Sequence, residues 1–190
     1  MSADPREPSA GVTLVALLRG INLGRHRRLS MATLREGLGE LGYGEVRTQG
    51  QSGNVVLRAS APPSEVARAI ESQIESRLEL EVDVIVRTAD ELSDVLAADP
   101  LGAVAGDPAR HLVAFFPSEP DRALLEKLAE RDFAPEQWSV RGREVHLWCP
   151  NGVQDSPLSK LVGDRRLAPS VTVRNWRTLT KVLEMARAAG

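Results

Sequence analysis

Apolar runs and amphipathic stretches follow one another along the first half of the chain. Val12 to Leu18 is a continuous apolar run, which is typical of a strand covered on both faces. From residue 31 to residue 41 apolar side chains recur every three or four positions, so an amphipathic helix is predicted there, with Ser30 as its N-cap. The same patterns predict strands at 45–48, 54–58 and 82–87 and a helix that opens at Pro62-Pro63.

The second half repeats this order of elements. The patterns predict strands at 111–116, 137–141, 144–148 and 171–174 and helices at 122–130 and 157–167. Each half then ends in an extra helix, and aligning Val86-Arg87 with Val173-Arg174 makes three apolar positions of these two helices coincide. The predicted fold is therefore α+β: a tandem duplication of ferredoxin-like (βαββαβ, α/β plait) units, each followed by an extra helix.

The domain boundaries follow from composition. Residues 1–11 contain prolines and mixed charge without an apolar core segment, which predicts a disordered N-terminal tail and not a signal peptide. The first ferredoxin-like unit is expected at 12–100 and the second at 110–190. No apolar run approaches the roughly 20 residues of a membrane-spanning helix, so we expect a cytoplasmic protein without a membrane partner. The sequence does not define the oligomeric state.

Charge is distributed unevenly, although the formal net charge of the 190 residues is only −2. Positively charged regions at 19–58 and 141–181 flank an acidic region at 65–107. This pattern could orient an anionic partner without making the whole protein basic. Charges scattered over solvated helix faces would give the same pattern, so the distribution alone does not identify a partner.

Cysteine and histidine offer little for metal or cofactor chemistry. Cys149 is the only thiol, which excludes an intramolecular disulfide and a cysteine-rich zinc site, and we expect it to be a small buried side chain. His26, His111 and His146 are far apart in the sequence and form no HExxH pair. The sequence therefore predicts no metal site, and it contains no motif for a cofactor.

The two halves differ most in the connection between the first strand and the first helix, which is longer in the first half. This connection, Arg19 to Arg28, contains two glycines and four arginines. Glycine lets backbone N–H groups approach an anion, and arginine offers paired donors, so Arg19, Gly20 and Asn22 are candidate ligand-binding residues. The loop is neither a P-loop nor a dinucleotide-binding fingerprint, because the spacing of its glycines fits neither motif.

Two more segments could contribute to a binding site. Ser52, Gly53 and Asn54 lie in a predicted hairpin turn, where a polar contact to a ligand is more credible than a serine nucleophile, since no strand–turn–helix elbow follows. Arg174-Asn175-Trp176 lies where the last strand meets the last helix; Asn175 suits an N-cap, and Trp176 suits packing or stacking. Lys160 adds a cation upstream.

Several of these motifs together resemble the bacterial family of domains of unknown function called DUF1697. The resemblance rests on Leu17 to Gly24, Gln51 to Val56, Ser159-Lys160-Leu161 and Thr172 to Thr178, and it spans about Val12 to Ala186. It implies tandem α/β plaits. It implies no reaction, because the family has no assigned activity.

We therefore predict that the chain binds a small anionic ligand, nucleotide-like or phosphate-like, between the two units. An enzyme acting on a phosphate or acyl compound, with Ser52 or Lys160 in the chemistry, is the alternative, and the sequence leaves open whether any reaction is catalysed. A nucleic-acid or protein interaction module that uses the arginine-rich loop is a third reading. Binding of nucleic acid by stacking is disfavoured, because the central strands of the first half contain no aromatic residue.

Overall fold

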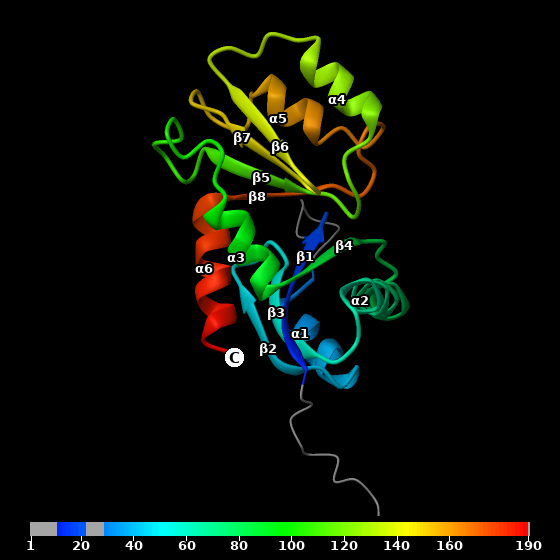
Figure 1. Cartoon of the computed structure of the whole chain (residues 1–190). Helices are drawn as coiled ribbons and strands as arrows, with labels where there is room; N and C mark the ends of the chain where they lie inside the picture. The colour runs from blue at the N-terminus through cyan, green and yellow to red at the C-terminus, as the bar shows by residue number, and fades with distance from the viewer. Residues whose placement is uncertain (1–10, 22–28, 190) are drawn as a thin grey trace, which may run out of the picture.

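The computed structural model describes residues 11–21 and 29–189, which form two four-stranded antiparallel sheets and six helices (Figure 1). The first half contains β1 (Val12–Arg19), α1 (Met31–Glu40), β2 (Gly44–Gln49), β3 (Asn54–Ala59), α2 (Pro63–Leu78), β4 (Asp83–Thr88) and α3 (Ala89–Ala97). The second half contains β5 (His111–Phe115), α4 (Arg122–Ala129), β6 (Gln137–Arg141), β7 (Glu144–Trp148), α5 (Pro157–Val162), β8 (Thr172–Asn175) and α6 (Trp176–Arg187). The predicted α+β class is confirmed. The predicted tail lies outside the described residues, apart from residue 11.

The two sheets have the same strand order, β2-β3-β1-β4 in the first and β6-β7-β5-β8 in the second. In each half the first strand pairs antiparallel with the third and the fourth. Equivalent positions of the two sheets carry the same residue types: Val15 pairs with Arg87 in the first sheet, and Val113 pairs with Arg174 in the second.

Each sheet buries both of its faces. The outer face of the first sheet packs against α1 and α2, and that of the second packs against α4 and α5. The inner faces share one core with α3 and α6, to which Val15, Leu17, Val113 and Phe115 contribute. Covering on both faces explains the continuous apolar runs of β1 and β5, because alternate side chains enter different cores.

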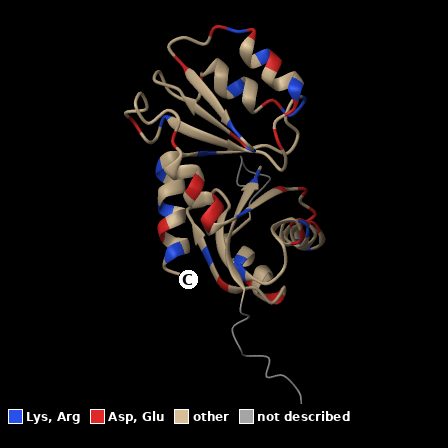
Figure 2. Cartoon of the chain, viewed as in Figure 1, with Lys and Arg blue, Asp and Glu red and all other residues tan. Residues whose placement is uncertain are grey.

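Helix α6 joins the two halves. It follows β8 in sequence, yet it packs against β1, β2 and β3 of the first sheet and lies beside α3 (Figure 1). The charged residues of α3 are acidic, whereas α6 carries basic residues together with Glu184 (Figure 2). The Arg187 guanidinium of α6 donates a hydrogen bond to the Ser93 hydroxyl of α3 at 3.1 Å, which links the two helices.

The helices begin with the caps that the sequence predicts. Thr88 and Glu91 form a capping box at α3, and the Asn175 side chain accepts a hydrogen bond from the backbone N–H of Thr178 at α6. One boundary was wrong: α5 was expected to reach residue 167 but ends at Val162, because the chain turns at Gly163, its C-cap. No helix in the described part of the chain is both long and apolar enough to cross a bilayer.

Candidate functional site

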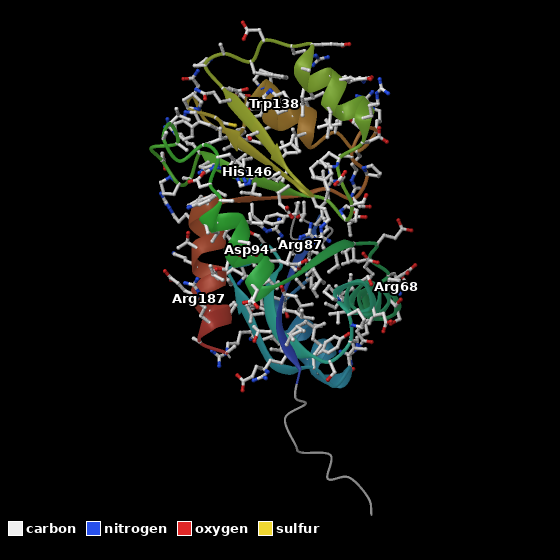
Figure 3. The ribbon with its side chains drawn as sticks, viewed as in Figure 1. Arg68, Arg87, Asp94, Trp138, His146 and Arg187 are labelled. Atoms are coloured by element: carbon white, nitrogen blue, oxygen red, sulfur yellow. The ribbon has the colours of Figure 1, made fainter. Side chains whose placement is uncertain are left out.

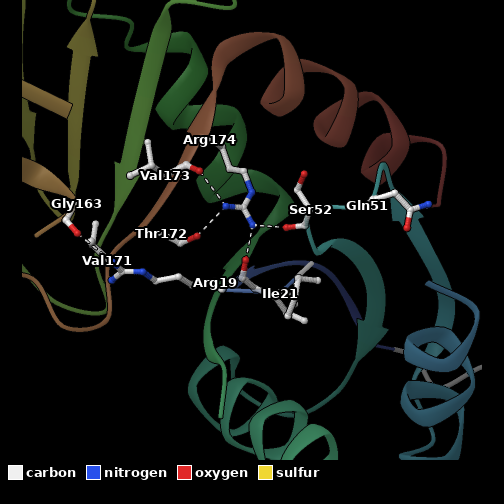
Figure 4. A pocket seen from close by; sticks show the side chains of 11 residues that line it. Arg19, Ile21, Gln51, Ser52, Gly163, Val171, Thr172, Val173 and Arg174 are labelled. Carbon is white, nitrogen blue, oxygen red and sulfur yellow. Dashed lines mark hydrogen bonds between the residues drawn. The ribbon is translucent and has the colours of Figure 1, made fainter. Parts of the chain in front are cut away.

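A cleft of about 360 Å³ lies where the two halves meet (Figure 4). Three segments that are distant in sequence line it: the end of β1 with the residues after it, the turn between β2 and β3, and β8 with the residues before it. Its lining residues are Leu18, Arg19, Gly20, Ile21, Gln51, Ser52, Gly163, Val171, Thr172, Val173 and Arg174. The fold thus brings together the first loop, the hairpin turn and the β8 arginine.

Arg174 connects the second half of the chain to the first, because three of its five hydrogen-bond acceptors belong to the first half. Its Nε donates to the Asn54 Oδ1 at 2.5 Å. Its Nη2 donates to the carbonyls of Leu18 at 2.6 Å and Ser52 at 2.9 Å (Figure 4). Its Nη1 donates to Thr172 Oγ1 and the Val173 carbonyl at 2.8 and 2.9 Å. These acceptors are all uncharged, and removal from water lowers the pKa of Arg174 to about 10.

Arg19 makes the reverse connection, from the first half to the second. Its guanidinium donates to the carbonyls of Gly163, Ala168 and Pro169 at 3.0 to 3.2 Å. Burial lowers its pKa, and the neighbouring positive charge of Arg165 acts in the same direction. Asp83 opposes this shift, but that carboxylate also contacts Arg165 at 3.4 Å. The cleft therefore carries excess positive charge.

Arg87 occupies the position in the first sheet that Arg174 occupies in the second, and it lies between the two halves (Figure 3). Its Nη2 donates to the Phe116 carbonyl at 2.6 Å, much as Arg174 donates to the Leu18 carbonyl. Its Nε, however, donates to a carboxylate, that of Glu144, at 3.0 Å. Burial lowers the pKa of Arg87, whereas the charge of Glu144 opposes that shift. One of the two matching arginines thus has a counter-charge and the other has an amide.

Asn54 and Gly53 shape the wall behind Arg174. Asn54 is buried, and its amide nitrogen donates to the Gln49 carbonyl at 3.1 Å, which orients its oxygen toward the guanidinium. Gly53 has φ +73°, and a Cβ there would lie 2.7 Å from Leu18 Cβ and Ile21 Cδ1. Only glycine fits this turn without displacing the strand end. Both residues build the cleft from behind, since neither lines it.

Other candidate residues from the sequence lie elsewhere. Lys160 does not line the cleft; it is exposed and lies 3.5 Å from Asp155. Asn175 serves as the N-cap of α6, and Trp176 stacks on His111, with ring centroids 4.3 Å apart and planes inclined by 5°. Asn22 and the remaining arginines of the first loop lie outside the described residues.

The described lining residues contain no carboxylate, imidazole, thiol or amine. Ser52 therefore has no general base among them, and Ser52 contacts Arg174 through its backbone carbonyl. A phosphate or carboxylate could be held there by charge and hydroxyl groups. Acid–base chemistry would need groups that this lining does not supply.

A second polar cluster lies under Trp176. One donor nitrogen each from His111 and His146 and an oxygen of Asp99 all lie within 4.8 Å of one another. Both histidines are buried, at 2% and 1% exposure. Burial lowers the pKa of His111, and burial together with the charge of His111 lowers that of His146 to about 4, so both rings are neutral near pH 7.

Sequence reasoning missed the Arg87–Glu144 pair and this histidine cluster. The alignment of Val86-Arg87 with Val173-Arg174 contained the signal for Arg87, because it makes the two arginines equivalent. No spacing rule would have found the cluster: its members lie on β5, on β7 and in the segment after α3, and only the pairing of β5 with β7 brings the histidines together.

Comparison with known proteins gives a family and a fold. A family model described as "Protein of unknown function (DUF1697)" matches residues 12–146. The solved structure of the conserved bacterial protein SP0830 from Streptococcus pneumoniae is similar, with a TM-score of 0.73 and 19% sequence identity. The similarity covers 93% of this chain and 99% of that one, and at this identity it concerns the fold alone. No curated protein matches the chain.

Proposed function

Because the chain belongs to the DUF1697 family, whose function is unknown, we propose a function from its geometry: it binds a small organic anion in the cleft between its two halves. The observation that carries this proposal is the neutral surroundings of Arg174. A guanidinium withdrawn from water without a carboxylate partner favours an anion beside it. Arg87 provides the contrast. It occupies the matching position in the first sheet, but its Nε donates to the carboxylate of Glu144, whereas the Nε of Arg174 donates to the amide of Asn54.

The lining favours an organic anion over a bare inorganic ion. Thr172 and Ser52 bring hydroxyl groups, while Leu18, Ile21 and Val171 contribute apolar side chains. A volume of about 360 Å³ lies within the range of small-molecule sites, roughly 300–1,000 Å³. A carboxylate or phosphate monoester with a small apolar body matches this combination. Ligand sensing or sequestration matches a cleft whose described lining residues carry no acid–base group.

We further infer that the two halves are ferredoxin-like units that arose by duplication. The identical strand order supports this inference, as do the matched registers of β4 and β8 and the equivalent positions of Arg87 and Arg174. In this interpretation the two arginines descend from one ancestral position. Today Arg87 has a charged partner, whereas Arg174, which lines the cleft, has a neutral one.

The test uses the change Asn54→Asp, which places a carboxylate beside Arg174 with almost no change in shape. Thermal unfolding of the full chain is measured with a nucleoside monophosphate, a sugar phosphate and a dicarboxylate, each beside its uncharged analogue. A ligand at 100 times its Kd stabilises the folded state by about 2.7 kcal/mol, which is measurable as a rise in Tm. We expect an anion to raise the Tm of the wild type and to have little effect on Asn54→Asp.

Asn151→Asp is the matched control, because it makes the same chemical change at an exposed position outside the cleft. This variant should keep the full ligand-induced shift. If Asn54→Asp does not fold, Arg19→Gln removes a cleft cation from a partly exposed position and should weaken the same shift. No stabilisation by any anion, or an equal shift in Asn54→Asp and the wild type, would refute the proposal.

A further inference from the structure

Asp99, His111 and His146 converge on one point from three separate elements. His111 and His146 project from the paired strands β5 and β7 on the inner face of the second sheet, and His146 is visible there in Figure 3. Asp99 follows α3, the helix that the inner faces of both sheets cover. The cluster is distinct from the anion cleft, since none of its three residues lines that cleft.

Two buried nitrogen atoms of this cluster have no hydrogen-bond partner. His111 Nε2 and His146 Nδ1 are both inaccessible to solvent and lack an acceptor or donor among the described residues. The nearest oxygen of Asp99 is 3.5 Å from His111 Nε2, which is too long for a good hydrogen bond. Buried polar atoms are nearly always satisfied, so two unsatisfied imidazole nitrogens in one cluster require an explanation.

The donor set matches a divalent transition metal. Neutral imidazole and carboxylate are the ligands that Zn²⁺ and its neighbours accept, and two histidines with one carboxylate leave a fourth position open. Ligands of a tetrahedral zinc, about 2.0–2.1 Å from the ion, lie roughly 3.3 Å apart. The present donor atoms lie within 4.8 Å of one another, so a modest inward shift would complete the site.

Asp99 offers an entry route, and its carboxylate oxygen already lies 3.5 Å from His111 Nε2, close to the separation of two zinc ligands. Its side chain is 24% exposed, whereas those of the histidines are enclosed. On the other side, Trp176 stacks flat on the His111 ring and fixes its plane. The stacking therefore holds the His111 ring, and the partly exposed carboxylate is the ligand that an ion entering from solvent would meet first.

We propose that Asp99, His111 and His146 bind one divalent transition-metal ion, with Zn²⁺ and Co²⁺ as suitable ions. The ion would satisfy both orphaned nitrogens and would tie the segment after α3 to the second sheet. Because β8 leads from the anion cleft to Trp176, an ion here would also fix the base of α6 close to that cleft. The proposal does not depend on anion binding.

The experiment titrates the tag-free, chelator-treated full chain with Co²⁺ and follows the visible absorption of the metal, with Zn²⁺ as competitor. We expect one Co²⁺ per chain, displaced by Zn²⁺. Asp99→Asn and His146→Gln should each weaken binding by about tenfold or more, since losing a ligand should cost at least as much as losing a residue that only orients one. Asp94→Asn on α3 makes the same substitution as Asp99→Asn at a position outside the cluster and should bind as the wild type does.

Circular dichroism and Tm confirm that each variant is folded. If His146→Gln does not fold, Asp99→Asn decides, because the partly exposed Asp99 side chain tolerates substitution better than a core histidine. Wild-type protein that binds no Co²⁺ would overturn the proposal. Unchanged affinity in Asp99→Asn would overturn it as well.

Discussion

The change Glu144→Gln isolates the charge of one buried ion pair between the two halves. The Arg87 Nη2 and Glu144 Oε1 atoms are 2.9 Å apart, and the two side chains are only 3% and 10% exposed. Glutamine keeps the shape and an oxygen that can accept from Arg87, so the variant loses the negative charge and little else.

The size of the effect follows from Coulomb's law. Two unit charges about 4 Å apart attract by about 4 kcal/mol at an effective dielectric constant of ~20. Glutamine is less costly to bury than glutamate, which returns part of this energy. We therefore expect the free energy of unfolding to fall by about 2–3 kcal/mol, which is somewhat less than the 3–5 kcal/mol typical of removing one partner from a buried pair.

Urea denaturation at pH 7, followed by circular dichroism, measures this loss. Glu126→Gln is the matched control, because Glu126 forms an exposed pair with Arg122 at 2.6 Å and should contribute less than about 0.5 kcal/mol. A loss below about 1 kcal/mol for Glu144→Gln would refute the reasoning. It would mean that the hydrogen bonds of Arg87 to the Phe116 and Val86 carbonyls suffice to stabilise the guanidinium.

Two further predictions concern the turn behind the cleft and the buried thiol. Gly53→Ala should lower the free energy of unfolding by about 2–4 kcal/mol, because the added Cβ would meet a positive φ and contacts of 2.7 Å. Gly50→Ala is the control: its φ is +66° but the space around it is open, so it should cost only about 1 kcal/mol in the same urea assay. Burial raises the pKa of Cys149, so the unfolded chain ionises first and stability should decline as pH rises above about 9. Labelling of Cys149 by a thiol reagent should then follow global unfolding, and rapid labelling of the native protein would contradict its burial.

Much of the fold could be predicted from local patterns. The continuous apolar run of β1 indicates a strand covered on both faces, and the caps at Ser30, Thr88 and Asn175 mark helix starts that the structure confirms. Local patterns were less reliable at α5, where apolar residues continue past Gly163 although the helix ends there. A pattern of apolar positions gives the covered face of a segment, but it does not show whether the backbone hydrogen bonds continue.

The candidate site was predictable only in part. Glycine and arginine at strand ends identified Arg19 and Arg174, and the structure brings both to one cleft. The same reasoning grouped Trp176 with them, but its ring lies on His111. A side chain's direction depends on the face of the strand or helix that carries it, and one residue along the chain reverses that direction on a strand.

The sequence by itself determined the elements, their order and the equivalence of Arg87 with Arg174, because these depend on neighbours along the chain. Tertiary structure alone decided which partner each arginine received: Glu144 for one and Asn54 for the other, both contributed by the opposite half. It also decided that Asp99, His111 and His146 meet. The physical reason is that charge compensation and ligand geometry depend on distances of a few ångströms between strands, which the packing of the two sheets around α3 and α6 sets.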